Sequence, residues 1–177
     1  MIAYHDTEWG VPCRDDQKLF EYIILDTFQA GLSWQIILRK RENFRHAFDN
    51  FTAVKIARYT DAKLTKLMTD SGIIRNRLKI KGTVKNAQAF LKIQKEFGSF
   101  ARYLWAFVHN RPIIHRHRRT NQIGTSNRES DALSLDLKKR GFTFVGTTIC
   151  YAFMQGAGLI NDHLITCFRY SQVSLQK

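Results

Sequence analysis

Helical spacing of apolar residues runs through most of this chain, and it constrains the fold more than any other feature. The first clear stripe is Leu19, Phe20, Ile23, Ile24 and Phe28, in which apolar side chains recur every three or four residues. This spacing places them on one face of an α-helix. Few segments alternate polar and apolar residues as strands do, so the sequence predicts an all-α fold.

Residues that favour helix ends divide the chain into the expected helices. Asp15 or Asp16 could cap the first long helix, which ends near Gly31. Ser33 could cap a second helix that begins at Trp34. Further elements are expected from Thr60 to about Met68, over about 74–96, over 100–108, after a capping box of Ser126 and Glu129, and over 145–157, with a loop at 109–125.

Length and composition favour a globular protein from a reducing compartment. A chain of 177 residues is expected to form one domain or two small lobes, and its 44% of hydrophobic residues is enough for a core. The three cysteines are few and odd in number, which fits free or metal-bound thiols better than a disulfide framework. No apolar run approaches ~20 residues, and the N-terminus does not resemble a signal peptide. We therefore expect a cytoplasmic protein without a membrane segment.

A strong excess of positive charge predicts a polyanionic partner. The chain has 28 Lys and Arg against 15 Asp and Glu, a formal net charge of +13. This balance favours nucleic acid before a membrane surface. A basic protein without such a partner is the alternative. Residues 75–95 contain basic residues and no acid, a pattern that a solvated helix face explains equally well.

Two glycines, Gly141 and Gly146, flank a short turn between two expected helices. Glycine lets the backbone turn tightly and approach a ligand, and the N–H groups that open the next helix point toward an anion. Lys138, Lys139 and Arg140 stand just before the turn and add positive charge. The segment predicts a phosphate-binding site; a tight pair of helices without a ligand is the alternative.

A second turn, Gln29–Trp34, lies between the first two long helices. Its Gly31 and Leu32 could present an apolar wedge, and Trp34 could form the wall of a pocket. Enzymes that flip a base out of DNA need both features. A helix corner with a core tryptophan is the alternative.

Asp26 interrupts the apolar face of the first long helix, which is unusual for an acid without a partner. It shares a helix face with Gln29. Tyr4, Trp9 and Trp34 could stack on a planar ligand. An acid surrounded by aromatic rings would favour a cationic or hydrogen-bond-donating base, whereas a surface or capping acid is the alternative.

A candidate metal site joins the two ends of the chain. His163 and Cys167 lie four residues apart, so one helical face could carry both. With His5 they give the nitrogen and sulfur ligands that zinc accepts. Cys13 could be a fourth ligand, although its spacing does not require it, and a core histidine is the alternative for His163.

Taken together, these residues resemble the 3-methyladenine DNA glycosylase I family of the helix-hairpin-helix glycosylase superfamily. The matching segments follow the family's order and cover nearly the whole chain. These segments are Tyr4–Pro12, Gln29–Trp34, Lys40–Phe44, Gly72–Arg75, Lys138–Tyr151 and Asn161–His163.

The resemblance implies a single glycosylase domain, residues 1–177, built from two helical lobes. The central lobe would span about 35–125. The second lobe would combine about 1–34 with about 126–177. The resemblance further implies that the lesion pocket lies between the two lobes.

The resemblance also implies a role for each site residue. Catalysis would rest on Asp26, Tyr4 and Trp34, with Trp34 stacked on the flipped base and Asp26 at the position of the family's pocket glutamate. Trp9 and Gln29 would line the base pocket. The residues implied to contact DNA, without reading its sequence, are Gly31, Leu32, Lys139, Arg140, Gly141, Gly146, Thr147 and Thr148.

The implied activity is hydrolysis of the N-glycosidic bond of 3-methyladenine in double-stranded DNA, by a monomer that leaves an abasic site. Methylation at N3 makes the base cationic and a better leaving group, and aromatic faces with a carboxylate suit that cation. Thr148 stands where lyase members of the superfamily carry a catalytic lysine, so we expect a monofunctional hydrolase. The main alternative is a non-catalytic DNA-binding remnant. A basic RNA-binding protein would leave Asp26 beside Trp34 unexplained.

Zinc is the implied cofactor, because His5, His163 and Cys167 match three of the family's four structural ligands. The chain begins about a dozen residues later than the family pattern, whose extra segment carries the fourth ligand, a cysteine. The sequence therefore indicates either a late start or a truncated chain with an incomplete zinc site. Asp26 is also one methylene shorter than the family's glutamate, which changes its reach toward the base.

Overall fold

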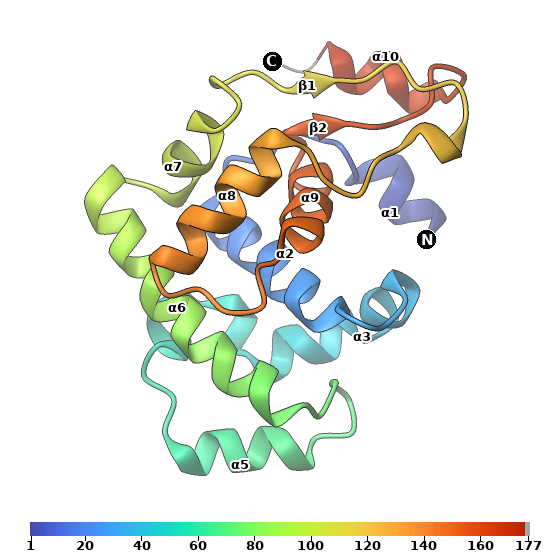
Figure 1. Cartoon of the computed structure of the whole chain (residues 1–177). Coiled ribbons are helices and arrows are strands. Elements are labelled where there is room, and N and C mark those ends of the chain that lie inside the picture. Colours follow the sequence, from blue (N-terminus) through green and yellow to red (C-terminus); the bar gives the residue numbers. More distant parts are fainter. Residues whose placement is uncertain (176–177) are drawn as a thin grey trace.

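The computed structural model describes residues 1–175, and most of these residues are helical (Figure 1). Two short 3-10 helices, η1 (Asp49–Phe51) and η2 (Thr120–Gln122), and two short strands, β1 (Ile113–Ile114) and β2 (Ile160–Asn161), accompany the α-helices. The α-helices are α1 (Ile2–Thr7), α2 (Asp16–Gln29), α3 (Trp34–Ala47), α4 (Ala53–Ile56), α5 (Asp61–Thr69), α6 (Arg77–Phe97), α7 (Phe100–Ala106), α8 (Arg128–Lys139), α9 (Thr147–Gly156) and α10 (Phe168–Ser174).

Helix α2 forms the centre of the core. It packs against α3, α6, α7 and α9 and lies near the middle of the molecule in Figure 1. The predicted apolar stripe is fully buried, from Leu19 to Phe28. Phe28 packs edge-on against Phe44 of α3, with ring centroids 4.8 Å apart. Burying one such side chain contributes roughly 1.5–3 kcal/mol, so the stripe fixes the helices around α2.

The start of α2 resolves the choice between two capping residues. Asp15 is the N-cap, and its Oδ1 accepts a hydrogen bond from the backbone N–H of Lys18 at 2.7 Å. Asp16 instead accepts from the backbone N–H groups of Phe100 and Ala101, each at 2.8 Å. The second acid therefore joins α2 to the start of α7, which satisfies helix N–H groups that would otherwise lack partners.

The N-terminal segment runs beside the C-terminal part of the chain. The N–H of Gly10 donates to the carbonyl of Gln155, and the N–H of Cys13 donates to the carbonyl of Ala157, each at 3.0 Å. Gly158 has a φ of +75°, and a Cβ there would lie 2.3 Å from the carbonyl carbon of Val11. Only glycine allows this approach. The contacts agree with an expected lobe of both chain ends, while the lobe boundaries remain a prediction.

The all-α prediction holds for most of the molecule but misses a parallel pair of strands. Ile113 pairs with Ile160 and Ile114 pairs with Asn161, so β1 lies within the segment that the sequence predicted as a loop. Each strand has two residues, which is too short for an alternating pattern to be visible. The pairing depends on residues distant in sequence, so local periodicity could not predict it.

The predicted capping box before α8 is wrong by one residue. The N-cap is Asn127, whose side chain accepts from the N–H of Ser130 at 2.7 Å. In return the Ser130 hydroxyl accepts from the N–H of Asn127 at 2.9 Å. Asn127 and Ser130 therefore have the reciprocal roles that the sequence assigned to Ser126 and Glu129. Among the helices of residues 1–175, none is long and apolar enough to span a membrane.

Candidate active site

Asp26 is a buried acid of helix α2. Asp26 is 5% exposed, and within residues 1–175 its side chain forms no hydrogen bond or ion pair. Burial alone raises the pKa of Asp26 well above its ordinary value. A buried carboxyl with a perturbed pKa and no partner is typical of a functional site.

Two aromatic rings from other helices lie together in this region. Tyr4 of α1 and Trp34 of α3 have ring centroids 5.5 Å apart at an interplanar angle of 59°. Burial, followed by the charges of Asp26 and Glu8, raises the pKa of Tyr4, so its phenol stays neutral and can donate a hydrogen bond. The Trp34 indole Nε1 is buried without a hydrogen-bond partner among the described residues. Tyr4, Asp26 and Trp34 thus provide apolar faces and unused polar groups.

The other predicted base-pocket residues have different surroundings. Gln29 is half-buried at the end of α2, one turn after Asp26. Trp9 packs against the ring of His163 at 4.5 Å and stacks on His5 at 6.0 Å. Its ring contacts therefore belong to the histidine cluster. Trp9 connects to the other aromatics through its backbone N–H, which donates to the carbonyl of Tyr4 at 2.9 Å.

The corner between α2 and α3 exposes the predicted wedge. Gly31 has a φ of +83°, a conformation that favours glycine. Leu32 is 37% exposed, and its N–H donates to the carbonyl of Gln29 at 2.6 Å. An apolar side chain at the tip of a tight turn suits insertion into a base stack.

Lys79 holds this corner and was not identified as a site residue from the sequence. Its ammonium donates to the carbonyl of Phe28 at 3.0 Å and to that of Ala30 at 2.8 Å. Lys79 is only 7% exposed, and burial lowers its pKa. A cation here satisfies the carbonyls at the C-terminus of α2 and complements the helix dipole. The sequence showed Lys79 only as one member of a basic run.

The glycine turn joins α8 to α9, which pack against each other. Gly141 has a φ of +96°, and Lys139 and Thr148 are exposed beside the turn. Gly146 is the N-cap of α9 and offers no side chain, so N–H groups at this helix start are open to an anion. The binding of a phosphate at this turn stays a prediction.

Two predicted DNA-binding side chains are already engaged within the protein. Arg140 donates to Asp136 at 2.6 Å and to Glu96 at 2.7 Å, and its guanidinium lies over the Tyr103 ring. Thr147 donates to Asp131. These contacts give both side chains a structural role at the turn, and the exposed Lys139 is better placed for phosphate.

The predicted metal ligands come together in space. His5, His163 and Cys167 place one donor atom each within 4.8 Å of one another, and Cys167 Sγ lies 3.6 Å from His5 Nε2. Asp6 holds His5 Nδ1 at 2.7 Å and Asn161 holds His163 Nδ1 at 2.9 Å, which leaves each Nε2 available. His163 Nε2 is buried with no partner in the described part of the chain.

The chemistry of this donor set fits zinc. Burial, with the nearby His5, lowers the pKa of His163 to about 4, so the imidazole is neutral at pH 7, as a ligand must be. Two imidazoles with outer partners and one thiol would supply three of the four ligands that a structural zinc site needs. A Cβ at Gly10 would lie 2.8 Å from the His163 ring, so glycine there makes room for the ligand.

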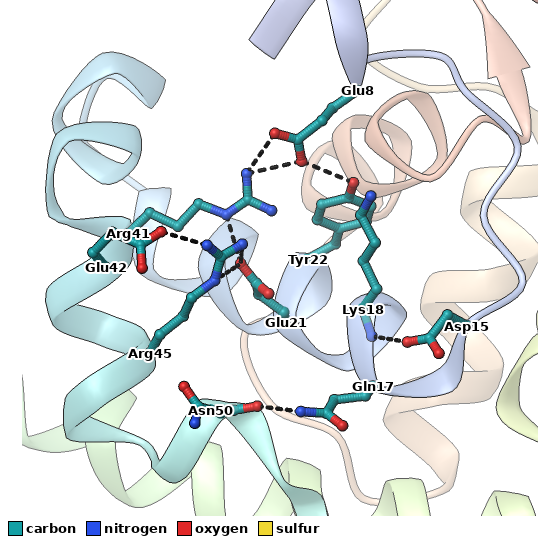
Figure 2. A network of polar contacts seen from close by, with 10 residues as sticks. All are labelled: Glu8, Asp15, Gln17, Lys18, Glu21, Tyr22, Arg41, Glu42, Arg45 and Asn50. Atoms are coloured by element: carbon teal, nitrogen blue, oxygen red, sulfur yellow. Dashed lines mark hydrogen bonds and ion pairs between the residues drawn. The ribbon is translucent and has the colours of Figure 1, made fainter. Parts of the chain in front are cut away.

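A network of ion pairs, to which the sequence pattern assigned no role, joins α2 and α3 to Glu8, the residue that follows α1. Arg41 of α3 donates to both oxygens of Glu8, at 2.9 and 2.8 Å, and to Glu21 of α2 at 2.5 Å. Arg45 also donates to Glu21, at 3.0 Å, and the Tyr22 hydroxyl donates to Glu8 at 3.1 Å. Figure 2 shows Arg41 between the two acids. The network fixes the segment after α1, and with it the position of Tyr4.

Known proteins match this chain over most of its length. A family described as methyladenine glycosylase matches residues 1–170. DNA-3-methyladenine glycosylase 1 of Escherichia coli (strain K12) is 50% identical over 169 residues, which cover 96% of this chain and 90% of that protein. DNA-3-methyladenine glycosylase of Haemophilus influenzae is 48% identical over 166 residues, 94% of this chain and 90% of that protein.

Solved structures show the same fold. The crystal structure of a 3-methyladenine DNA glycosylase I has a TM-score of 0.92 at 50% identity and covers 94% of this chain and 92% of that one. The enzyme from Staphylococcus aureus, solved to explain 3-methyladenine recognition, has a TM-score of 0.93 at 36% identity, over 96% of this chain and 90% of that one. The family match over residues 1–170 includes the segments that carry Tyr4, Asp26 and Trp34.

Proposed function

The chain belongs to the methyladenine glycosylase family, and on this premise we propose that it removes 3-methyladenine from alkylated DNA. The reaction is hydrolysis of the N-glycosidic bond, which leaves an abasic site. The observation that carries the proposal at the level of residues is the buried Asp26, which has no partner within residues 1–175 and lies near Tyr4 of the aromatic pair Tyr4 and Trp34.

Asp26 gives the site a preference for a cationic base. Without an opposite charge, burial favours its neutral form. A base methylated at N3 carries positive charge in the nucleotide, and that charge favours the ionised carboxylate. Unmodified adenine is neutral and gains no such interaction. Trp34 supplies a ring for stacking, and the neutral Tyr4 phenol supplies a hydrogen-bond donor at the side of the base.

The base must leave the duplex before it can reach these groups. We assign the gap that it leaves to Gly31 and Leu32, because the exposed Leu32 lies at a tight turn held by Lys79. The turn between α8 and α9 would hold backbone phosphates through its N–H groups, with Lys139 nearby. This division makes binding largely independent of sequence and assigns specificity to the base site.

Zinc would bind His5, His163 and Cys167 and would serve a structural role. When bound, it supplies a link between α1, which carries Tyr4, and the segment before α10. The enzyme would act as a monomer on double-stranded DNA in the cytoplasm, and its hairpin would belong to the helix-hairpin-helix class. Thr148 in the place of a catalytic lysine favours a hydrolase without lyase activity.

The alternative, a non-catalytic DNA-binding remnant, is disfavoured. A remnant has no reason to retain a buried acid that costs stability, together with aromatic groups that meet near it. The relatives named as glycosylases match 94–96% of this chain, and the family match over residues 1–170 includes the segments of the base site.

The direct test is release of 3-methyladenine from methylated duplex DNA, measured by chromatography of the free base. The intact protein should release it and leave abasic sites without strand cleavage. Trp34→Ala should lose roughly 10–100-fold, because stacking contributes about 1–3 kcal/mol per base. Leu135→Ala, which truncates a 58% exposed leucine, is the matched control and should keep full activity. DNA binding without any release would support the remnant instead.

A further inference from the structure

A second cluster of metal-binding side chains lies at the strand pair. His115 Nδ1 is 2.5 Å from Asp162 Oδ1, and His117 Nε2 is 3.1 Å from the same oxygen. The two imidazole rings have centroids 5.0 Å apart. None of these three side chains has a role in the function proposed above.

Backbone pairing brings the two histidines to one side. The N–H of His115 donates to the carbonyl of Asn161 at 3.2 Å, and the N–H of Ile165 donates to the carbonyl of His117 at 2.9 Å. These bonds extend the contact between β1 and β2 beyond the strands themselves. Residues two apart in an extended segment face the same side, so both imidazoles meet Asp162 of the neighbouring segment.

Asp162 is oriented in the manner of a metal ligand. Its side chain is fully buried. Tyr151 and Gln155 of α9 both donate to Oδ2, at 2.7 and 2.6 Å, so Oδ1 alone faces the histidines. Outer hydrogen bonds of this kind orient ligands and are typical of metal sites.

We propose that His115, His117 and Asp162 form a second metal site, for a divalent transition ion such as zinc. Their donor atoms all lie within 4.8 Å of one another. Bonds of about 2.0–2.2 Å to a tetrahedral zinc require donors roughly 3.3 Å apart, so His115 must turn slightly away from Asp162. The His115 side chain is 32% exposed and that of His117 is 18% exposed, which leaves an entry path and room for a water ligand.

This site differs from the cluster at the chain ends in its donor atoms. His163, the next residue after Asp162, belongs to the cluster with His5 and Cys167. That cluster offers a sulfur, whereas the second offers only nitrogen and oxygen. Two imidazoles and a carboxylate suit Zn²⁺ and also Fe²⁺, Co²⁺ and Ni²⁺. The second site would pin the 113–117 segment against the C-terminal part of the chain.

Cobalt spectroscopy on the intact, metal-stripped protein separates the two clusters. A Co²⁺ ion with a thiolate ligand shows a strong near-ultraviolet charge-transfer band, and one with only nitrogen and oxygen ligands does not. We expect visible Co²⁺ bands without that charge-transfer band to persist in Cys167→Ala. His117→Ala and His115→Ala should each weaken this binding at least about tenfold, since each removes one of three protein ligands. His46→Ala, which removes an exposed histidine of α3, is the matched control.

A positioning test uses the outer hydrogen bonds. Tyr151→Phe removes a donor to Asp162 Oδ2 and should weaken Co²⁺ binding roughly 10–100-fold, while circular dichroism reports the fold. The proposal fails if Cys167→Ala binds no Co²⁺. It also fails if, in the Cys167→Ala protein, His115→Ala and His117→Ala leave Co²⁺ binding as tight as His46→Ala does. Either result would identify the cluster as a set of hydrogen bonds around Asp162. Base release is measured separately, so this failure would leave the glycosylase assignment unaffected.

Discussion

Helix α2 carries two buried acids, Glu21 and Asp26, whose surroundings are opposite. Glu21 is 8% exposed and accepts hydrogen bonds from Arg41 and Arg45. Asp26 is 5% exposed and has no such partner within residues 1–175. The first acid is neutralised by the protein itself. The second is kept neutral by burial, and its ionised form would need a cation from outside the protein.

The contrast shows how a structural acid can be separated from a functional one. Burying a carboxylate is costly unless a cation or a hydrogen-bond donor compensates it. Arginines offset the desolvation of the Glu21 carboxylate, so its network can hold helices together. No cation of the described residues offsets the desolvation of an ionised Asp26, and a cationic base can supply that positive charge.

The largest expected effect tests the structural side of this contrast. Arg41→Met leaves Glu8 and Glu21 without their shared cation and should lower the free energy of unfolding by about 3–5 kcal/mol, because it breaks a buried pair. Urea unfolding measures the loss. Arg39→Met, at an exposed position of the same helix, should change stability little. If both variants unfold alike, the network is not what stabilises this region.

The functional side is tested by Asp26→Asn, which keeps the shape and removes the charge. Release of 3-methyladenine should fall roughly 100-fold, the order expected when one electrostatic contact to the reacting group is lost. Single-turnover release from methylated DNA is the measurement. Asp61→Asn, an exposed acid at the start of α5, is the control. Unchanged release in Asp26→Asn would remove the acid from the mechanism.

Lys79 sharpens the comparison because it is a buried cation at the end of the same helix. Lys79→Met removes two charge-assisted hydrogen bonds to the α2 terminus and should cost about 1.5–3 kcal/mol of stability. As a positioning residue for Leu32, it should also weaken binding to a duplex with an abasic site about tenfold. Fluorescence anisotropy measures that binding, with the exposed Lys81→Met as control. Loss of stability with unchanged binding would restrict Lys79 to a structural role.

The smallest effect is a pH-dependent gain of stability in Asp26→Asn. The folded protein holds the Asp26 proton more tightly than the unfolded chain, so this group's favourable contribution is complete below its unfolded pKa of about 3.9. It is lost as pH rises through the raised folded pKa. At neutral pH the variant should therefore be more stable by roughly 0.5–2 kcal/mol, and the difference should shrink in acid. Thermal unfolding at several pH values checks this, and a difference that grows in acid would contradict it.

Local patterns predicted most of the helices but not the contacts between them. The apolar stripe of α2 and the Thr60 cap of α5 are found as expected, because each depends on residues close in sequence. The strand pair joins Ile113 to Ile160, and no local pattern contains both residues. The roles of the candidate base-site residues were predicted from the family resemblance. Lys79, by contrast, looked like one of many surface lysines.

The sequence by itself determined a mostly helical, basic protein, the residue types available for a base site, and the helix on which Asp26 lies. Tertiary structure decided which charged side chains form ion pairs within the protein. Arg140 is paired with Asp136 and Glu96, and Glu21 is paired with Arg41, whereas no residue among 1–175 pairs with Asp26. Helix periodicity is a local property that a few neighbouring residues set. The free energy of a buried charge depends on whichever groups surround it, and here these come from helices distant in the chain.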